Sequence, residues 1–222
     1  VASEDLTDVL FPLGELTKRE VRQIAAEAGL PVSTKRDSTG ICFIGERPFD
    51  EFLSRYVRPT PGRIVTETGK TIGAHRGLPF YTLGQRRGLG VGGVADRPED
   101  AWYVAAKRAE TNELVVVQGH DHPALLGNWL ETAAMHWIGP PPAAIARHGV
   151  VDCHAKTRYR QADQACRLTL RPDGSAEAVF AASQRSMTPG QYAVFYEGER
   201  CLGGARIERT GWREAVNAAV AG

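Results

Sequence analysis

One cysteine of this sequence lies in a short run bounded by glycines and rich in charged and hydroxyl side chains. The run extends from Arg36 to Arg47 and places Cys42 between Gly40 and Gly45. Nearby cations and free backbone N–H groups favour the thiolate, which is the nucleophilic form of cysteine. The run therefore predicts a shaped loop with a reactive thiol. Its apolar centre also fits a short buried strand with an inert thiol, because free cysteine is among the most buried residue types.

Positive charge is concentrated in two stretches of the chain. The net charge is only +1 over 222 residues. Residues 55–91 nevertheless contain seven Lys or Arg and one acidic residue, and residues 154–171 contain five and one. Such asymmetry is typical of a surface that binds a polyanion. A solvated face, neutralised by acidic groups nearby in space, fits the same pattern.

Length and composition are those of ordinary globular domains. The 222 residues suit one large or two to three small domains, and 42% hydrophobic residues support a core. No apolar run reaches the length of a membrane span, and no charged-then-apolar leader opens the sequence, so we expect a cytoplasmic protein. The four cysteines lack Cys-x-x-Cys spacing and are too few for a disulfide scaffold, which disfavours a zinc site and indicates reduced thiols.

Helix signals stand on both sides of the cysteine run. Thr17 and Glu20 have the spacing of a capping box, and Gly29 is placed to end the helix that follows. After the run, Pro48 suits the first turn of a second helix, which Pro59 would close. We therefore expect one helix before the cysteine run and one after it in the sequence.

The middle of the chain has the pattern of two strand pairs around a glycine-rich segment. The strands are expected at 64–66, 71–73, 102–105 and 114–117. The glycine-rich segment, 77–93, lacks the Gly-x-x-x-x-Gly-Lys-Ser/Thr pattern, which disfavours a nucleotide site. Its side chains that can meet an RNA backbone or stack on a base are Tyr81, Gln85, Arg86 and Arg87. A purely structural glycine turn fits equally well.

Two histidines on either side of Asp121 raise the question of a metal site. His120 and His122 are one residue apart in a loop, with no third ligand nearby in sequence. A metal site normally needs three or four ligands, so this interpretation is weak and a role in lining the turn is the alternative.

The remaining sequence predicts an all-β domain. Strands are expected at 128–137, 149–159, 164–171, 175–181, 190–197 and 200–208. Six short strands at this spacing fit a closed antiparallel barrel. The cysteines that fall within these strands, and are expected to be inert packing residues, are Cys153, Cys166 and Cys201. The fold class is therefore α+β but mainly β, with domains at 1–58, 59–122 and 123–211 and a tail at 212–222.

Four segments closely resemble the bacterial tRNA-specific 2-thiouridylase family, which also carries an older methyltransferase label. The segments are 37–47, 81–86, 156–161 and 188–191. By this resemblance Cys42 matches the family's persulfide-carrying cysteine. The positions that match tRNA contacts are Arg158, Tyr159 and Gln191. The resemblance also implies a C-terminal barrel similar to the second domain of a translation elongation factor.

The resemblance implies transfer of sulfur to the wobble uridine of tRNA. The family uses ATP with Mg²⁺, bound by a domain whose Ser-Gly-Gly-Val-Asp-Ser loop and second catalytic cysteine are absent from this sequence. We therefore expect no cofactor in this chain and no activity without that domain. The implied partners are tRNA and a sulfur-relay donor protein, and the chain is expected to be monomeric.

Two other classes of function are alternatives to this one. The competing class is a non-catalytic RNA-binding module, in which the middle domain and the barrel hold tRNA for a separate enzyme. Methyl transfer, which the older label suggests, is not supported, because no strand leads into a glycine-rich loop that opens a helix.

Overall fold

The computed structural model describes residues 2–35, 49–92, 100–159 and 161–213. The chain forms two compact units, Val1–Tyr56 and Val57–Gly222. In chain order the elements are η1 (Ser3–Leu6), α1 (Lys18–Glu27), α2 (Phe49–Ser54), β1 (Gly62–Thr66), β2 (Thr71–His75), η2 (Leu78–Phe80), β3 (Trp102–Arg108), β4 (Glu113–Gln118), η3 (Pro123–Leu125), β5 (Leu126–Ala134), β6 (His136–Trp137), α3 (Ala143–His148), β7 (Val150–Lys156), β8 (Gln164–Leu170), β9 (Ser175–Arg185), β10 (Tyr192–Glu197) and β11 (Arg200–Gly211).

The first unit contains the predicted capped helix. Glu20 N–H donates to Thr17 Oγ1 at 3.4 Å, and Thr17 N–H donates to Glu20 Oε2 at 2.7 Å, so the capping box is confirmed. The hydrogen bond from the Thr17 side chain lowers the pKa of Glu20. Gly29 follows the helix with a φ of 67°, in the left-handed region that favours glycine. Within 2–35 no residue is buried, and no helix in the described residues is long and apolar enough to cross a membrane.

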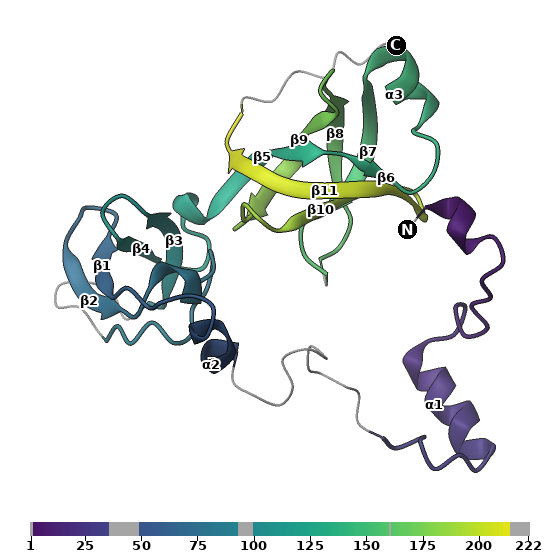
Figure 1. Ribbon diagram of the computed structural model, residues 1–222, viewed down its shortest axis with the longest axis horizontal. Helices are drawn as coiled ribbons and strands as arrows, with labels where there is room; N and C mark the ends of the chain where they lie inside the picture. The colour runs from purple at the N-terminus through teal and green to yellow at the C-terminus, as the bar shows by residue number, and fades with distance from the viewer. Residues whose placement is uncertain (1, 36–48, 93–99, 160, 214–222) are drawn as a thin grey trace. The chain divides into compact units, whose positions relative to one another are not determined.

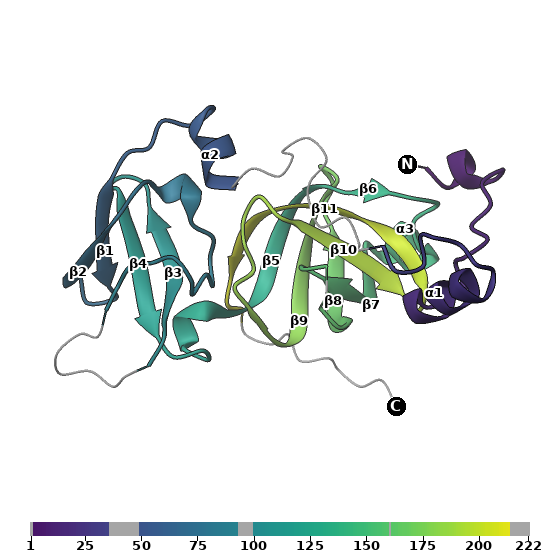
Figure 2. The same cartoon turned by 90° about the horizontal axis from the view of Figure 1, so that it is seen from below.

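The middle region is a four-stranded mixed sheet with strand order β2–β1–β4–β3. Its two antiparallel pairs, β1–β2 and β3–β4, confirm the predicted strand pairs, and Figure 2 shows β4 between β1 and β3. The parallel pairing of β1 with β4 was not predicted. Residues Glu113 to Val117 are all buried, because β4 is central and covered on both faces.

The C-terminal region is a closed six-stranded antiparallel barrel, as the strand pattern predicted. Its strands follow the order β10–β7–β8–β9–β5–β11, and pairing of β10 with β11 closes the ring (Figure 1). Alternate residues of β7 are buried, which places Val151, Cys153 and Ala155 in the core. The central side chains of this core include Leu168 and Phe195, both fully buried.

Three details of the barrel differ from the sequence expectation. Strand β9 continues to Arg185, four residues beyond the predicted end. The two-residue strand β6 is separate from β5 and pairs with β11. The alanine-rich stretch before β7 forms α3, which Gly149 ends with a φ of 69° and an N–H to Ile145 C=O hydrogen bond of 2.9 Å.

Candidate nucleic-acid interface

A cavity of about 560 Å³ lies within the second unit, between a loop of the middle region and the ends of barrel strands. Its lining residues are Thr82, Leu83, Gly84, Gln85, Thr157, Arg158, Tyr159 and Gln191. These residues come from three segments singled out in the sequence, 81–86, 156–161 and 188–191. Segments more than 100 residues apart in sequence therefore meet at one site. We call this site the RNA cavity below.

Arg158 supplies a cation at the RNA cavity. It follows β7, and its Nη2 donates to the main-chain oxygen of Ser186 at 3.2 Å. Burial, and then the nearby Arg185 guanidinium, lower the pKa of Arg158. No carboxylate forms an ion pair with Arg158 among the residues that the structure describes. A negatively charged ligand would therefore stabilise the charged guanidinium and offset its repulsion from Arg185.

Tyr159 and Gln191 offer a ring and an amide at the same cavity. Tyr159 is 94% exposed, so its ring is available for stacking. The main chain of Gln191 is fixed by N–H donation to Thr188 C=O at 3.1 Å and by acceptance from Ile207 N–H at 2.7 Å. Its side-chain amide has no hydrogen-bond partner within the described parts of the chain. An exposed ring beside a free amide suits recognition of an unpaired base.

The three further RNA candidates in the glycine-rich segment are placed differently. Gln85 lines the RNA cavity, but its amide is engaged within the loop: Oε1 accepts from Thr82 N–H and Nε2 donates to Arg87 C=O, each at 2.9 Å. Gln85 therefore shapes the loop. Arg86 and Arg87 are exposed and do not line the cavity, although both lie next to it in sequence.

Cys42 lies outside the described residues, but the three barrel cysteines are described. Cys153 and Cys166 are buried and face each other across β7 and β8, with 3.8 Å between their sulfur atoms. Hydrogen bonding to Cys153 and burial raise the pKa of Cys166. Cys201 lies in β11 and is half-buried. The positions of all three in strands are confirmed, and the burial of the first two matches a packing role.

The histidines at 120 and 122 make separate contacts. His120 Nδ1 lies 2.6 Å from Asp121 Oδ1, and His122 Nε2 lies 3.1 Å from Glu67 Oε2. His122 Nδ1 also accepts from Ala124 N–H at 3.2 Å, at the start of η3. This hydrogen bond gives His122 the role in lining the turn that was the alternative to a metal site. In the described ranges, no group of three or more His, Cys, Asp and Glu residues is arranged to hold a metal ion.

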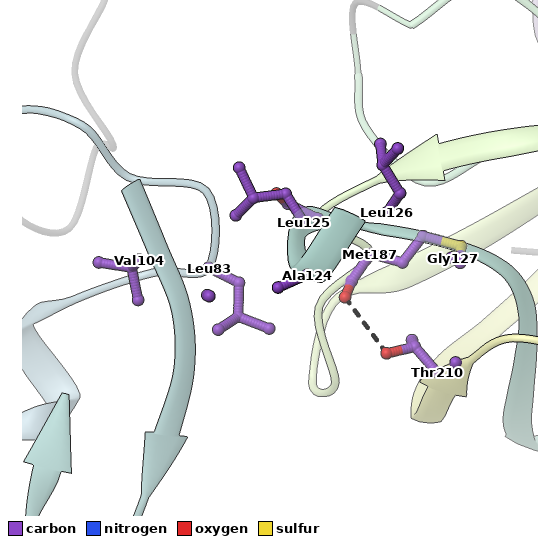
Figure 3. Close-up of a pocket in the computed structure, with 11 residues that line it drawn as sticks. Leu83, Val104, Ala124, Leu125, Leu126, Gly127, Met187 and Thr210 are labelled. Atoms are coloured by element: carbon purple, nitrogen blue, oxygen red, sulfur yellow. Dashed lines mark hydrogen bonds between the residues drawn. The ribbon is translucent and has the colours of Figure 1, made fainter. Parts of the chain in front are cut away.

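A second, smaller cavity lies at the same junction between the middle region and the barrel. It has a volume of about 170 Å³, and its lining surface is a nearly even mixture of polar and apolar atoms. Leu83 and Val104 line it from the middle region, Leu125 lines it from η3, and Met187 lines it from the barrel (Figure 3). Leu83 therefore borders both cavities, which makes its loop the shared wall between them.

Sequence reasoning missed the role of the residues that end β9. The expected strand ends at 181, which leaves Ser186, whose carbonyl accepts from Arg158, outside the expected elements. A serine in the left-handed region, with a φ of 52°, leaves no signal in a sequence.

Three family models match consecutive parts of the chain. They are the tRNA methyl transferase HUP domain over residues 1–46, the tRNA methyl transferase PRC-barrel domain over 50–118, and the aminomethyltransferase beta-barrel domain over 128–207.

Curated relatives named tRNA-specific 2-thiouridylase MnmA match nearly the whole chain. The protein of Paracidovorax citrulli is 53% identical over 214 residues, covering 93% of this chain and 55% of the relative. That of Cupriavidus metallidurans is 54% identical over 204 residues, covering 91% and 55%. The chain thus spans about half the length of the curated relatives it matches. It belongs to the MnmA tRNA 2-thiouridylase family and comprises the family's C-terminal domains with a fragment of the HUP domain.

Proposed function

We propose that this chain is the tRNA-holding part of a sulfurtransferase that converts the wobble uridine of tRNA to 2-thiouridine. The observation that carries the proposal is the meeting of three distant segments at the RNA cavity. Among the described residues, a cation with no ion-pair partner, an exposed ring and an amide with no hydrogen-bond partner lie together there, and such a set of groups suits single-stranded RNA. The names of the relatives, all tRNA-specific 2-thiouridylases, support the same substrate class.

Each side chain of the RNA cavity has a distinct role in this proposal. Arg158 binds a backbone phosphate through the guanidinium N–H groups that do not reach Ser186. Tyr159 stacks on a base, and the amide of Gln191 hydrogen-bonds a base edge or a 2′-hydroxyl. Arg86 and Arg87 add positive charge beside the cavity, which speeds the approach of RNA.

Cys42 carries the sulfur in this proposal. In loading, the Cys42 thiolate would attack the outer sulfur of a donor protein's persulfide, which forms the Cys42 persulfide and releases the donor's thiol. The terminal sulfur would then attack the activated carbonyl carbon of the uridine and displace its oxygen. A second thiol, from the cysteine of the absent domain, would break the bond to Cys42, forming a disulfide and releasing the 2-thiouridine. Because Cys42 lies outside the described residues, this step is supported by the sequence run 36–47 and its resemblance to the family.

ATP is not assigned to any residue of this chain. When bound to such an enzyme, ATP turns the uracil carbonyl oxygen into a leaving group. The sequence lacks the phosphate-binding loops that this requires, and the two cavities described above are lined by residues of 82–211, which hold no such loop. The residues present therefore do not fit ATP. For this chain by itself, the proposal is that it binds tRNA and is located in the cytoplasm.

A second function is supported by the lining of the RNA cavity. The lining residues among the described parts of the chain all lie in the unit Val57–Gly222, and a non-catalytic tRNA-binding module beside a separate enzyme would use the same residues. Comparing Cys42→Ser with the unaltered residue, in a protein that also has the ATP-binding part, separates the two functions. Loss of 2-thiouridine with retained tRNA binding supports the sulfur carrier, whereas unchanged 2-thiouridine supports the module.

The proposal of tRNA binding is tested by fluorescence anisotropy with labelled tRNA. The chain should bind weakly, and affinity should fall as salt rises because bound cations release counterions from the RNA. A perfect RNA duplex of equal length should compete less well than unlabelled tRNA, since the RNA cavity suits unpaired bases. Absence of binding at low salt would contradict the proposal.

A further inference from the structure

Two residues at the end of β9 touch both walls of the RNA cavity without lining it. Ser186 has a φ of 52° and is buried, with 6% of its surface exposed. Its N–H donates to Leu125 C=O at 2.6 Å, which ties it to the last residue of η3, just before β5. Its carbonyl oxygen accepts from Arg158 Nη2 at 3.2 Å and from Thr188 Oγ1 at 2.9 Å. Ser186 therefore orients the guanidinium at one wall.

The side chain of Ser186 is pressed against the opposite wall at Gly84. A Cβ added to Gly84 would lie 2.5 Å from Ser186 Oγ and 2.8 Å from Ser186 Cβ, so no larger residue fits without movement. Gly84 has a φ of 77°, and its N–H donates to Val104 C=O at 2.7 Å, which ties this loop to the middle sheet. The contact between Gly84 and Ser186 thus sets the spacing between sheet and barrel.

Arg185 reinforces this contact from the neighbouring position. Its Nε donates to His120 C=O at 2.9 Å, and its guanidinium lies 4.8 Å from the centre of the Tyr103 ring. Both partners belong to the middle region, whereas Arg185 itself is the last residue of β9. One barrel residue thus holds the middle sheet through a hydrogen bond and a cation–π contact.

The neighbouring part of the junction is not filled. The cavity of about 170 Å³ lies there, and Figure 3 shows Leu83 on one side of it and Met187 of the barrel on the other. Leu125, which also lines it, packs against Tyr103 and Val117 of the middle sheet, and the contacts at Gly84 and Arg185 add to this packing in aligning the two walls. A displacement at this point would move Gln85 relative to Arg158.

We propose that Arg185 and Ser186 are positioning residues that hold the two walls of the RNA cavity in register, with Gly84 as the surface against which Ser186 rests. The inference depends on the proposed tRNA binding. It goes beyond that binding because neither Arg185 nor Ser186 lines the RNA cavity.

The test is a set of variants of the full 222-residue chain, measured for tRNA affinity and thermal unfolding. Gly84→Ala should weaken tRNA binding about tenfold, because the added methyl group forces the two walls apart. Gly90→Ala is the matched control: Gly90 also has a left-handed φ, 65°, but a Cβ there meets nothing within 4 Å. The control carries the backbone strain without the collision. Combining Gly84→Ala with Ser186→Gly removes both colliding atoms and should restore part of the lost affinity.

Two outcomes would overturn the inference. One is equal tRNA affinity in the Gly84→Ala and Gly90→Ala proteins. The other is a double variant that binds no better than Gly84→Ala alone, since the Ser186 contact would then not be the cause.

Amide hydrogen exchange gives a readout that does not need RNA. In the Gly84→Ala protein the Ser186 amide should exchange faster, while the Leu168 amide in the barrel core should not change. If the unaltered chain fails to bind tRNA, the proposed function fails. The exchange of the Ser186 amide still decides the junction contact in that case, and an unchanged rate there overturns it.

Discussion

Replacing Arg158 by alanine removes the cation that the RNA cavity offers to phosphate. A hydrogen bond to a charged group contributes about 1.5–3 kcal/mol, so affinity for tRNA at low salt should fall roughly 10- to 100-fold. Loss of one phosphate contact should also reduce the slope of log affinity against log salt by about 0.7–0.9. The change should leave the fold intact, because the Ser186 carbonyl that Arg158 contacts still accepts from Thr188 Oγ1 at 2.9 Å.

A matched control removes the same charge from another part of the barrel. Arg147 is exposed on α3, and its Nε donates only to Ala143 C=O within its own helix, at 3.4 Å. Strand β7 begins just after this helix and ends just before Arg158, so its length, about 20 Å, separates the two arginines. At moderate salt this distance is screened, and Arg147→Ala should change affinity only slightly.

Fluorescence anisotropy at salt concentrations from about 50 to 200 mM measures both quantities, affinity and slope. Equal slopes for the unaltered and Arg158→Ala proteins would show that Arg158 makes no phosphate contact. An equal loss of affinity in Arg147→Ala would show that net charge matters and that the RNA cavity does not.

Two further predictions concern cysteine reactivity and pH. Brief alkylation near neutral pH followed by peptide mass mapping should label Cys42 before Cys153 and Cys166, because those two are buried and burial blocks access; faster labelling of either would contradict the sulfur-carrier role. Glu131 has its pKa lowered, chiefly by the hydrogen bond from Arg209, so its contribution to stability is present above its unfolded pKa of about 4.3 and is lost as pH falls through the lower folded value. The unaltered protein should therefore lose more thermal stability than Glu131→Gln between about pH 5 and pH 3; melting curves that shift in parallel would refute this.

Much of the barrel could be predicted because each strand carries its own signal. In β7 the buried residues alternate with exposed ones, and the apolar side chains at 151, 153 and 155 show that alternation in the sequence. The capping box at Thr17 was equally readable, since its two partners are three residues apart. Signals of this kind depend only on residues close together in sequence, so they can be recognised without knowing the tertiary structure around them.

The features that sequence could not provide are those that join distant segments. The parallel pairing of β1 with β4 joins residues about 50 positions apart and depends on the whole sheet. Ser186 has a left-handed φ, bonds to Leu125 and contacts Gly84, and the sequence around it specifies none of these three features. The resemblance to a family singled out the three segments of the RNA cavity, but only the fold shows that they meet.

The RNA cavity combines a held guanidinium, an amide on a held main chain and a free ring. The Arg158 guanidinium is fixed by the Ser186 carbonyl, and the main chain of Gln191, though not its side-chain amide, is fixed by bonds to Thr188 and Ile207. Tyr159, which is 94% exposed, must be ordered when RNA binds. Stacking on a base contributes about 1–3 kcal/mol, and ordering a side chain costs about 0.5–1.5 kcal/mol, so the ring adds a small net gain. The held groups therefore fix where RNA sits, and the free ring lets bases of different size be accepted.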